Sequence, residues 1–134
     1  RKMSKSYDNA IYLRDRGSDL RAKVLSMFTD PQRERKSDPG RPEICNVFAF
    51  HGIYTDAARV EEIGRECPRA GIGCVDCKKI LLAGLAAGLA PLHEKQDYYL
   101  ARPAEVAAVL AAGNAAADTI ARETMREVHD ALGF

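Results

Sequence analysis

Residues 76–92 read DCKKILLAGLAAGLAPL, and this stretch is the most informative about the fold class. Its large apolar side chains recur three or four residues apart, which is the spacing of one face of an α-helix. They are Ile80, Leu81, Leu85, Leu89 and Leu92. Pro91 predicts a kink near the end, because proline removes a helical hydrogen bond. We therefore predict a helix from Asp76 onward with one buried face.

The residues after this stretch predict more helix. Pro103 lies where a first-turn proline belongs, and Gly113 is expected to end the helix that begins there. A last helix is predicted from Ala115 to Leu132, followed by Gly133. Three of its apolar residues are expected to face inward: Ile120, Val128 and Leu132.

The residues before the stretch predict shorter helices and loops. Ser18-Asp19 can cap a first helix, and Thr55-Asp56 can cap a later one. Residues 32–42 are highly charged and rich in turn formers, so we expect a loop there that contributes nothing to a core. A short helix is expected around residues 44–51, and a glycine-containing loop over residues 68–73. The first helix has apolar residues at helical spacing, Leu20, Val24, Met27 and Phe28, and is expected to end before Pro31. In the later helix, Val60 and Ile63 are expected to face inward.

No stretch alternates between apolar and polar residues as a strand does, so the predicted fold is all-α. We divide it into an irregular lead-in, residues 1–17, and one helical domain, residues 18–134. With 134 residues, 46% hydrophobic and 29% charged, the chain is expected to be soluble and globular. The longest nearly apolar run, residues 80–92, is too short for a bilayer, and no apolar segment follows the basic first residues. We therefore expect a cytoplasmic protein without membrane contact.

The charges are unevenly distributed. Residues 1–41 hold eleven Lys and Arg against six Asp and Glu, giving +5, and the remaining residues hold nine against thirteen, giving −4. A basic end suits contact with phosphates. A solvated charged surface explains the same pattern, so charge alone identifies no partner.

Four cysteines fall within one 33-residue window, with 21, 6 and 2 residues between them. They are Cys45, Cys67, Cys74 and Cys77. A cytoplasmic protein is not expected to form disulfides, and two residues between Cys74 and Cys77 let both sulfurs point at one ion or cluster. Unrelated buried cysteines are the alternative, but the clustering favours a metal site with these four ligands.

Zinc and a [4Fe–4S] cluster both accept four thiolates. Structural zinc favours two C-x-x-C pairs, and this chain has one. A cluster tolerates looser spacing and accepts backbone N–H hydrogen bonds, for which Gly71 and Gly73 leave room. Spacing alone leaves the two nearly even, with a slight preference for iron–sulfur. His51 could replace a ligand, although a lone histidine in a helix is more often a packed or surface residue.

Residues 2–6 read KMSKS. Two lysines and two hydroxyls suit the stabilisation of a triphosphate, because the ammonium groups neutralise the charge that develops on leaving pyrophosphate. As a match of five residues this lysine-serine segment, residues 2–6, is weak evidence. A disordered tail can carry such a run.

Longer stretches make the evidence specific. KMSKSYDNAIYLRD (2–15) resembles the passage from the KMSKS loop of tryptophanyl-tRNA synthetases, which are class I enzymes, into their helical domain. DPGRPEICNV (38–47) is similar to the opening of that family's anticodon-binding domain, and GIGCVDCKK (71–79) to the passage before its long helix. Residues 121–134 resemble its C-terminal helix. The resemblance covers the whole chain in order.

The resemblance implies the helical anticodon-binding domain of such an enzyme, preceded by the KMSKS loop. The family joins tryptophan to tRNA(Trp) with ATP and Mg²⁺ through an adenylate, as a homodimer. Its Rossmann half, with the tryptophan pocket, is not among these residues. A subset of bacterial members holds a [4Fe–4S] cluster on four cysteines spaced much like these, so the resemblance favours the cluster over Zn²⁺.

The resemblance also implies residue roles. Lys5 would be the main catalytic contributor, within an ATP-binding set of Lys2, Met3, Ser4, Lys5 and Ser6. We further expect a cluster to hold the basic residues Arg69, Lys78 and Lys79 for contact with tRNA. The competing interpretation is a non-enzymatic nucleic-acid-binding module stabilised by zinc or iron–sulfur, which would have no need of residues 2–6. An electron-transfer protein fits less well, because it would need no anticodon-domain-like context.

Overall fold

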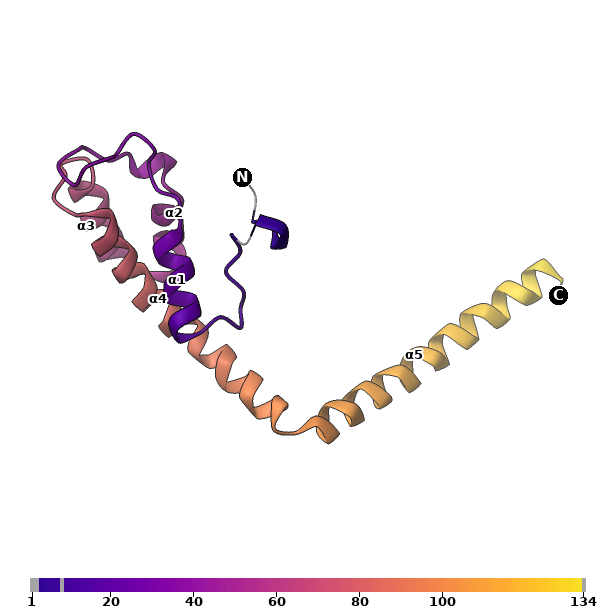
Figure 1. The fold of residues 1–134 in the computed structure, drawn as a ribbon. Coiled ribbons are helices and arrows are strands. Elements are labelled where there is room, and N and C mark those ends of the chain that lie inside the picture. Colours follow the sequence, from indigo (N-terminus) through magenta and orange to yellow (C-terminus); the bar gives the residue numbers. More distant parts are fainter. Residues whose placement is uncertain (1–2, 8, 134) are drawn as a thin grey trace. The chain divides into compact units, whose positions relative to one another are not determined.

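The structure is a computed structural model that describes residues 3–7 and 9–133. Those residues form helices and loops and contain no strand, which confirms the all-α prediction (Figure 1). The elements are η1 (Lys5–Tyr7), α1 (Gly17–Ser26), η2 (Pro42–Ile44), α2 (Asn46–Tyr54), α3 (Ala57–Glu66), α4 (Cys74–Leu100) and α5 (Pro103–Leu132). None of the described helices combines the length and apolarity that a membrane span requires.

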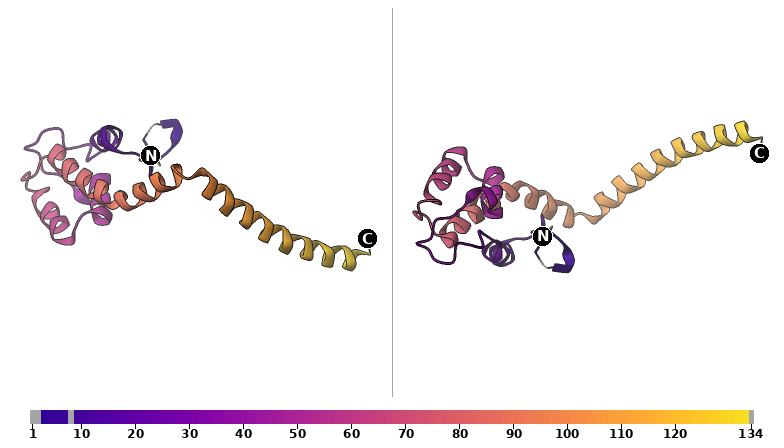
Figure 2. Two further views of the ribbon diagram at one scale, coloured as in Figure 1. Left: turned by 90° about the horizontal axis from the view of Figure 1, so that it is seen from below. Right: turned by 90° about the horizontal axis from the view of Figure 1, so that it is seen from above.

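The chain forms two compact units, Arg1–His93 and Glu94–Phe134. In the first, α1, α2 and α3 lie around the first part of α4 (Figures 1 and 2). The core cluster contains residues from three of these helices: Leu20, Val24, Val47, Leu81, Leu85 and Leu89. Burial of such side chains is the main favourable term in folding, which makes this cluster the structural base of the first unit.

Two glycines let the end of α2 approach α4. A Cβ at position 84 would lie 2.1 Å from the carbonyl oxygen of Tyr54, and one at position 88 would lie 3.0 Å from the Tyr54 ring. A side chain at Gly84 would therefore collide with backbone, which cannot move aside cheaply. The glycines of the apolar stretch serve packing between helices.

The predicted helices of the first unit need small corrections. α1 begins at Gly17, with φ of +49°, so Ser18 and Asp19 lie in its first turn and do not cap it. It ends at Ser26, before Pro31 as predicted, so Phe28 lies beyond the helix and is 65% exposed. The cap of α3 is confirmed, because the Asp56 side chain accepts a hydrogen bond from the Arg59 amide.

α4 begins two residues before the predicted start, at Cys74, and continues through Pro91 to Leu100. Leu81, Leu85 and Leu89 are buried as the periodicity predicts. Leu92 belongs to the same predicted stripe but is 40% exposed, so the buried face ends one turn earlier than expected.

In the second unit, the prediction that Gly113 ends a helix is wrong. α5 runs without a break from Pro103 to Leu132. A helical glycine costs only about 1 kcal/mol relative to alanine, and the alanines on both sides of Gly113 are the best helix formers. Pro103 at the start and Gly133 at the end, with φ of +75°, are confirmed.

The prediction of an inward-facing apolar stripe on the last helix is also wrong. Ile120 is 67% exposed, Val128 40% and Leu132 65%. No residue of α5, which is described throughout, is buried. The apolar residues of α5 thus have helical spacing without being buried within the described chain.

Candidate functional site

The four cysteines come from three places in the first unit. Cys45 precedes α2, Cys67 follows α3, and Cys74 and Cys77 lie in the first turn of α4. All four are free thiols, and all four line one small cavity. We refer to them as the four-cysteine centre.

The surroundings of this centre favour the protonated thiol at two of its cysteines. Burial raises the pKa of Cys77 to about 12, and the other three cysteines add to the effect. Burial also raises the pKa of Cys67. A metal would therefore have to displace protons to obtain thiolate ligands. The cavity wall is otherwise mostly apolar and includes Thr29, Arg33, Val47, Phe48, Ile63 and Ile72.

The arrangement does not close on a single ion. Among the described residues, no three His, Cys, Asp or Glu side chains are placed to hold one metal ion. Zinc needs four sulfurs about 2.3 Å from one atom, whereas an iron–sulfur cluster takes each cysteine on a different iron. The assignment of these residues as metal ligands stays a prediction.

His51 lies beside the centre as a hydrogen-bonding neighbour. It is fully buried in α2, its Nε2 is 3.3 Å from Cys77 Sγ, and its Nδ1 is 2.8 Å from Thr55 Oγ1. Burial lowers the pKa of His51, which favours the neutral ring. A neutral ring carries one N–H, so His51 donates at one of these two contacts and accepts at the other.

Arg33 is a second neighbour, and the sequence analysis missed it. Its side chain is only 9% exposed, and its Nη1 donates to Cys67 Sγ at 3.6 Å. Its Nη2 donates to the carbonyls of Lys36 and Ile72. Residues 32–42 add no side chain to the apolar core, as predicted, but Arg33 of this loop is buried beside the four-cysteine centre. The charges of this segment suggested solvent, and no local pattern marks one arginine as buried.

The loop that carries Arg33 is closed by an ion pair. The Asp30 carboxylate, 5% exposed, accepts hydrogen bonds from Arg41 Nη2 at 2.6 Å and Nε at 2.9 Å. It also accepts from the amides of Arg41 and Gln32. The Arg41 guanidinium holds the pKa of Asp30 well below its usual range, against the opposing effect of burial. This pair fixes residues 30–41 beside the four-cysteine centre.

Residues 3–6 of the lysine-serine segment begin the described part of the chain. Lys2 lies outside the described residues, and Met3 is 42% exposed. The Ser4 amide donates to Asn9 Oδ1 at 2.8 Å, and the Ser6 amide donates to Ser4 Oγ at 3.2 Å. The segment thus forms a local turn that leaves Lys5 exposed at the start of η1.

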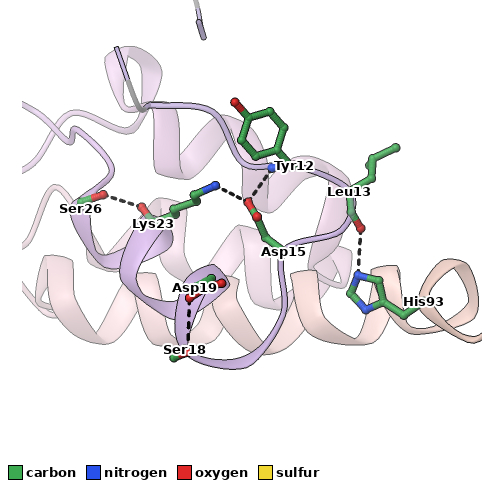
Figure 3. Close-up of polar contacts among 8 residues, drawn as sticks. All are labelled: Tyr12, Leu13, Asp15, Ser18, Asp19, Lys23, Ser26 and His93. Carbon is green, nitrogen blue, oxygen red and sulfur yellow. Dashed lines mark hydrogen bonds and ion pairs between the residues drawn. The ribbon is translucent and has the colours of Figure 1, made fainter. Parts of the chain in front are cut away.

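A polar anchor connects the residues after this segment to α1 and α4 (Figure 3). The Asp15 carboxylate accepts from Lys23 Nζ and from the Tyr12 amide, each at 2.7 Å. Burial raises the pKa of Asp15, but these hydrogen bonds outweigh it and hold the pKa below its usual value. His93 of α4 donates from Nε2 to the Leu13 carbonyl at 2.9 Å. The contact of His93 with Leu13 joins residues 80 apart in sequence, which sequence patterns do not reveal.

The three basic residues predicted to contact tRNA differ in availability. Arg69 is exposed in the loop after α3. Lys79 is exposed and pairs with Asp76 at 3.0 Å. Lys78 is half-buried, and its Nζ donates to the carbonyl of Leu25 near the end of α1. Their binding to tRNA stays a prediction. Lys78 would have to break its hydrogen bond with the Leu25 carbonyl to contact tRNA.

Comparisons with known proteins cover the whole chain. The sequence model of the family described as tRNA synthetases class I (W and Y) matches residues 1–89. The tryptophan–tRNA ligase of Aquifex aeolicus is 44% identical, over all of this chain and 34% of its own length. That of Thermotoga maritima is 42% identical, over all of this chain and 41% of its own length. The chain thus spans a third to two fifths of these curated relatives.

A solved structure has the same fold. The crystal structure of tryptophanyl-tRNA synthetase from Campylobacter jejuni, complexed with ADP and tryptophan, matches 99% of this chain and 41% of its own. The TM-score is 0.85 at 28% sequence identity. The matching helices are therefore arranged alike in a related protein.

Proposed function

Because the chain belongs to the class I tRNA synthetases of the tryptophan and tyrosine family, we propose that it is part of a tryptophan–tRNA ligase. The observation that carries this proposal is the similarity of the entire chain to proteins named tryptophan–tRNA ligase. The complete enzyme would act in the cytoplasm as a homodimer. Its substrates would be tryptophan, ATP with Mg²⁺, and tRNA(Trp).

The lysine-serine segment would serve the activation step. There the tryptophan carboxylate attacks the α-phosphorus of ATP, and the bond to pyrophosphate breaks. Lys5 is exposed and precedes a short turn, so its ammonium group is available to the leaving pyrophosphate. A fixed positive charge at this point stabilises the transition state more than the bound substrates. Met3, Ser4 and Ser6, with Lys2, would complete the ATP contact.

The polar anchor would orient this segment. Asp15 is buried and joins Tyr12 to Lys23 of α1, so the chain leaving the segment is attached to the helical unit. A short tether of this kind limits the positions that residues 2–6 adopt, which lowers the entropy lost on binding ATP. The helical residues 18–134 would form the anticodon-binding domain.

The four-cysteine centre would hold a [4Fe–4S] cluster, with Zn²⁺ as the alternative. When bound, such a cluster supplies cross-links between the three segments that carry its ligands, and no electron transfer is needed for that role. Cys67 and Cys74 flank the loop that carries Arg69. Ordering this loop in advance would reduce the entropy lost when Arg69, Lys78 and Lys79 contact the tRNA anticodon stem.

Replacing Lys5 by alanine in the complete enzyme tests the activation role. We expect tryptophan-dependent pyrophosphate exchange to fall about 100-fold, a typical loss for one electrostatic contact to a transition state. Tryptophan affinity, measured by calorimetry, should stay nearly unchanged. Lys95→Ala, at an exposed position in α4, is the control. A fall in tryptophan affinity at an unchanged exchange rate would contradict the assigned role.

The metal is tested on the complete protein purified without oxygen. Iron, sulfide and zinc are assayed together, with the visible absorption spectrum. We expect about four iron and four sulfide per chain and broad visible absorption from thiolate-bound iron. One zinc per chain without visible absorption would replace the cluster by the alternative.

A further inference from the structure

Arg33 is a buried cation whose polar partners do not balance its charge. Its side chain is 9% exposed, and its partners are the carbonyls of Lys36 and Ile72 and the sulfur of Cys67. Among the described residues, no ion pair includes Arg33. Burying a charge is costly unless an opposite charge lies nearby. The buried guanidinium therefore calls for a partner that carries negative charge.

One donor of this guanidinium also lacks a hydrogen bond. Arg33 Nε is buried and has no partner in the part of the chain that the structure describes. Native proteins rarely leave a buried donor unsatisfied, and each such group calls for an explanation. Arg33 lines the same cavity as the four cysteines, so a group bound there would lie next to it.

The charge of a loaded centre would supply the missing partner. Four thiolates outweigh the positive charge of either Zn²⁺ or a [4Fe–4S]²⁺ cluster, so the centre is net negative in both cases. We propose that Arg33 is the counter-cation and positioning residue of the four-cysteine centre, donating to the Cys67 thiolate and stabilising the bound group. This inference depends on the proposed metal centre, but not on which of the two metals fills it.

The same side chain joins two loops around the centre. Nη2 donates to Lys36 at 3.0 Å and to Ile72 at 2.8 Å, which connects the loop before α2 with the loop before α4. The Gly40 amide donates to the Cys67 carbonyl, and a Cβ at Gly40 would lie 2.5 Å from Cys67 Sγ and 3.2 Å from Arg33 Nη1. The Arg33 guanidinium thus packs on one side of Cys67, in a space that stays open because position 40 has no side chain.

The test compares Arg33→Gln and Arg33→Lys with Arg35→Gln in the complete protein. Arg35 is exposed in the same loop, so its loss is a matched removal of one positive charge from that loop. All variants are prepared without oxygen and assayed for iron, sulfide, zinc and helical melting. Release of the metal to a chromogenic chelator is then followed over time.

We expect Arg33→Gln to release its metal at least tenfold faster than the wild type, the range seen when a hydrogen-bonding neighbour of a metal ligand is lost. Arg33→Lys keeps the positive charge but lacks the forked hydrogen-bond donors of a guanidinium. Its rate of metal release should therefore lie between the rates of the wild type and Arg33→Gln. Arg35→Gln should match the wild type. If the metal is iron–sulfur, the potential for one-electron reduction by dithionite should fall in Arg33→Gln, because a positive charge near the cluster favours reduction.

The outcomes separate this inference from the metal proposal. A wild-type protein without iron or zinc would overturn the metal centre and with it the role of Arg33. A metal-containing wild type with unchanged release and potential in Arg33→Gln would overturn the role of Arg33 alone. If Arg33→Gln does not fold, the role of Arg33 is judged from Arg33→Lys. Metal release from Arg33→Lys no faster than from the wild type, with an unchanged reduction potential where iron–sulfur is bound, would overturn the inference.

Discussion

The two units of this chain are both helical but differ in what stabilises their helices. In the part of the chain that the structure describes, every buried side chain lies in Arg1–His93, including an apolar core and the charged groups of Asp30 and Arg33. In Glu94–Phe134, α5 has thirty residues and none of them is buried. Its local support comes from alanine-rich composition and pairs such as Arg122 with Asp118. Helix formation and core formation are therefore separate properties of this sequence.

The largest expected difference concerns core leucines. Leu85→Ala should destabilise the first unit by about 3 kcal/mol, because it removes a side chain that is 2% exposed and leaves a cavity. Leu110→Ala in α5, at 61% exposure, should change stability by less than about 0.5 kcal/mol. Urea denaturation followed by circular dichroism measures both. Equal effects would mean that α5 buries this leucine against something outside the described chain.

A smaller difference is expected for two helical glycines. Gly84→Ala should cost about 2 kcal/mol, because its Cβ would lie 2.1 Å from the Tyr54 carbonyl oxygen. Gly113→Ala should stabilise α5 by about 1 kcal/mol, since alanine favours the helix and no atom beyond the adjacent residues and backbone of α5 lies within 4 Å of the added methyl group. Hydrogen exchange of the amides in α4 and α5 reports each effect locally. We expect the two substitutions to change stability in opposite directions, and changes in the same direction would refute this prediction.

The smallest difference concerns two aspartates and depends on pH. The pKa of Asp30 lies below its usual value, so its ion pair stabilises the fold above about pH 4 and is lost as the pH falls further. Asp30→Asn should therefore lower the melting temperature at pH 7, with a gap to the wild type that narrows below about pH 4. Asp118→Asn removes an exposed pair of α5 and should cost no more than about 0.5 kcal/mol at pH 7. Melting curves from pH 3 to 7 test this, and a constant gap for Asp30→Asn would contradict it.

Local sequence signals were sufficient for much of the fold. The periodicity of residues 76–92 predicted the main helix, Asp56 and Pro103 marked helix starts, and Gly133 marked an end. These features depend on backbone geometry and hydrogen bonds within one turn, which neighbouring residues control. The resemblance carried by residues 2–15 and 38–47 indicated the family, which the comparisons confirmed.

The failures concern features that neighbouring residues do not control. Gly113 was expected to end a helix, but its cost of about 1 kcal/mol is small beside the helix-forming alanines around it. Ile120 was predicted to face inward but is exposed. Helical spacing of apolar residues places them on one side of a helix, but it does not supply a partner that covers them.

The candidate site likewise has a part that the sequence predicted and a part that it did not. The spacing of Cys74 and Cys77 marked two thiols that α4 presents in one turn, and the structure brings Cys45 and Cys67 to the same cavity from α2 and α3. Arg33 and the Asp30–Arg41 pair could not be predicted, because charged residues in a loop are normally solvated. Arg33 contacts the Cys67 sulfur and the Ile72 carbonyl, which lie more than thirty residues away in the sequence. Residue type and spacing thus indicate which groups are able to bind a metal, whereas long-range packing determines which charge lies beside them.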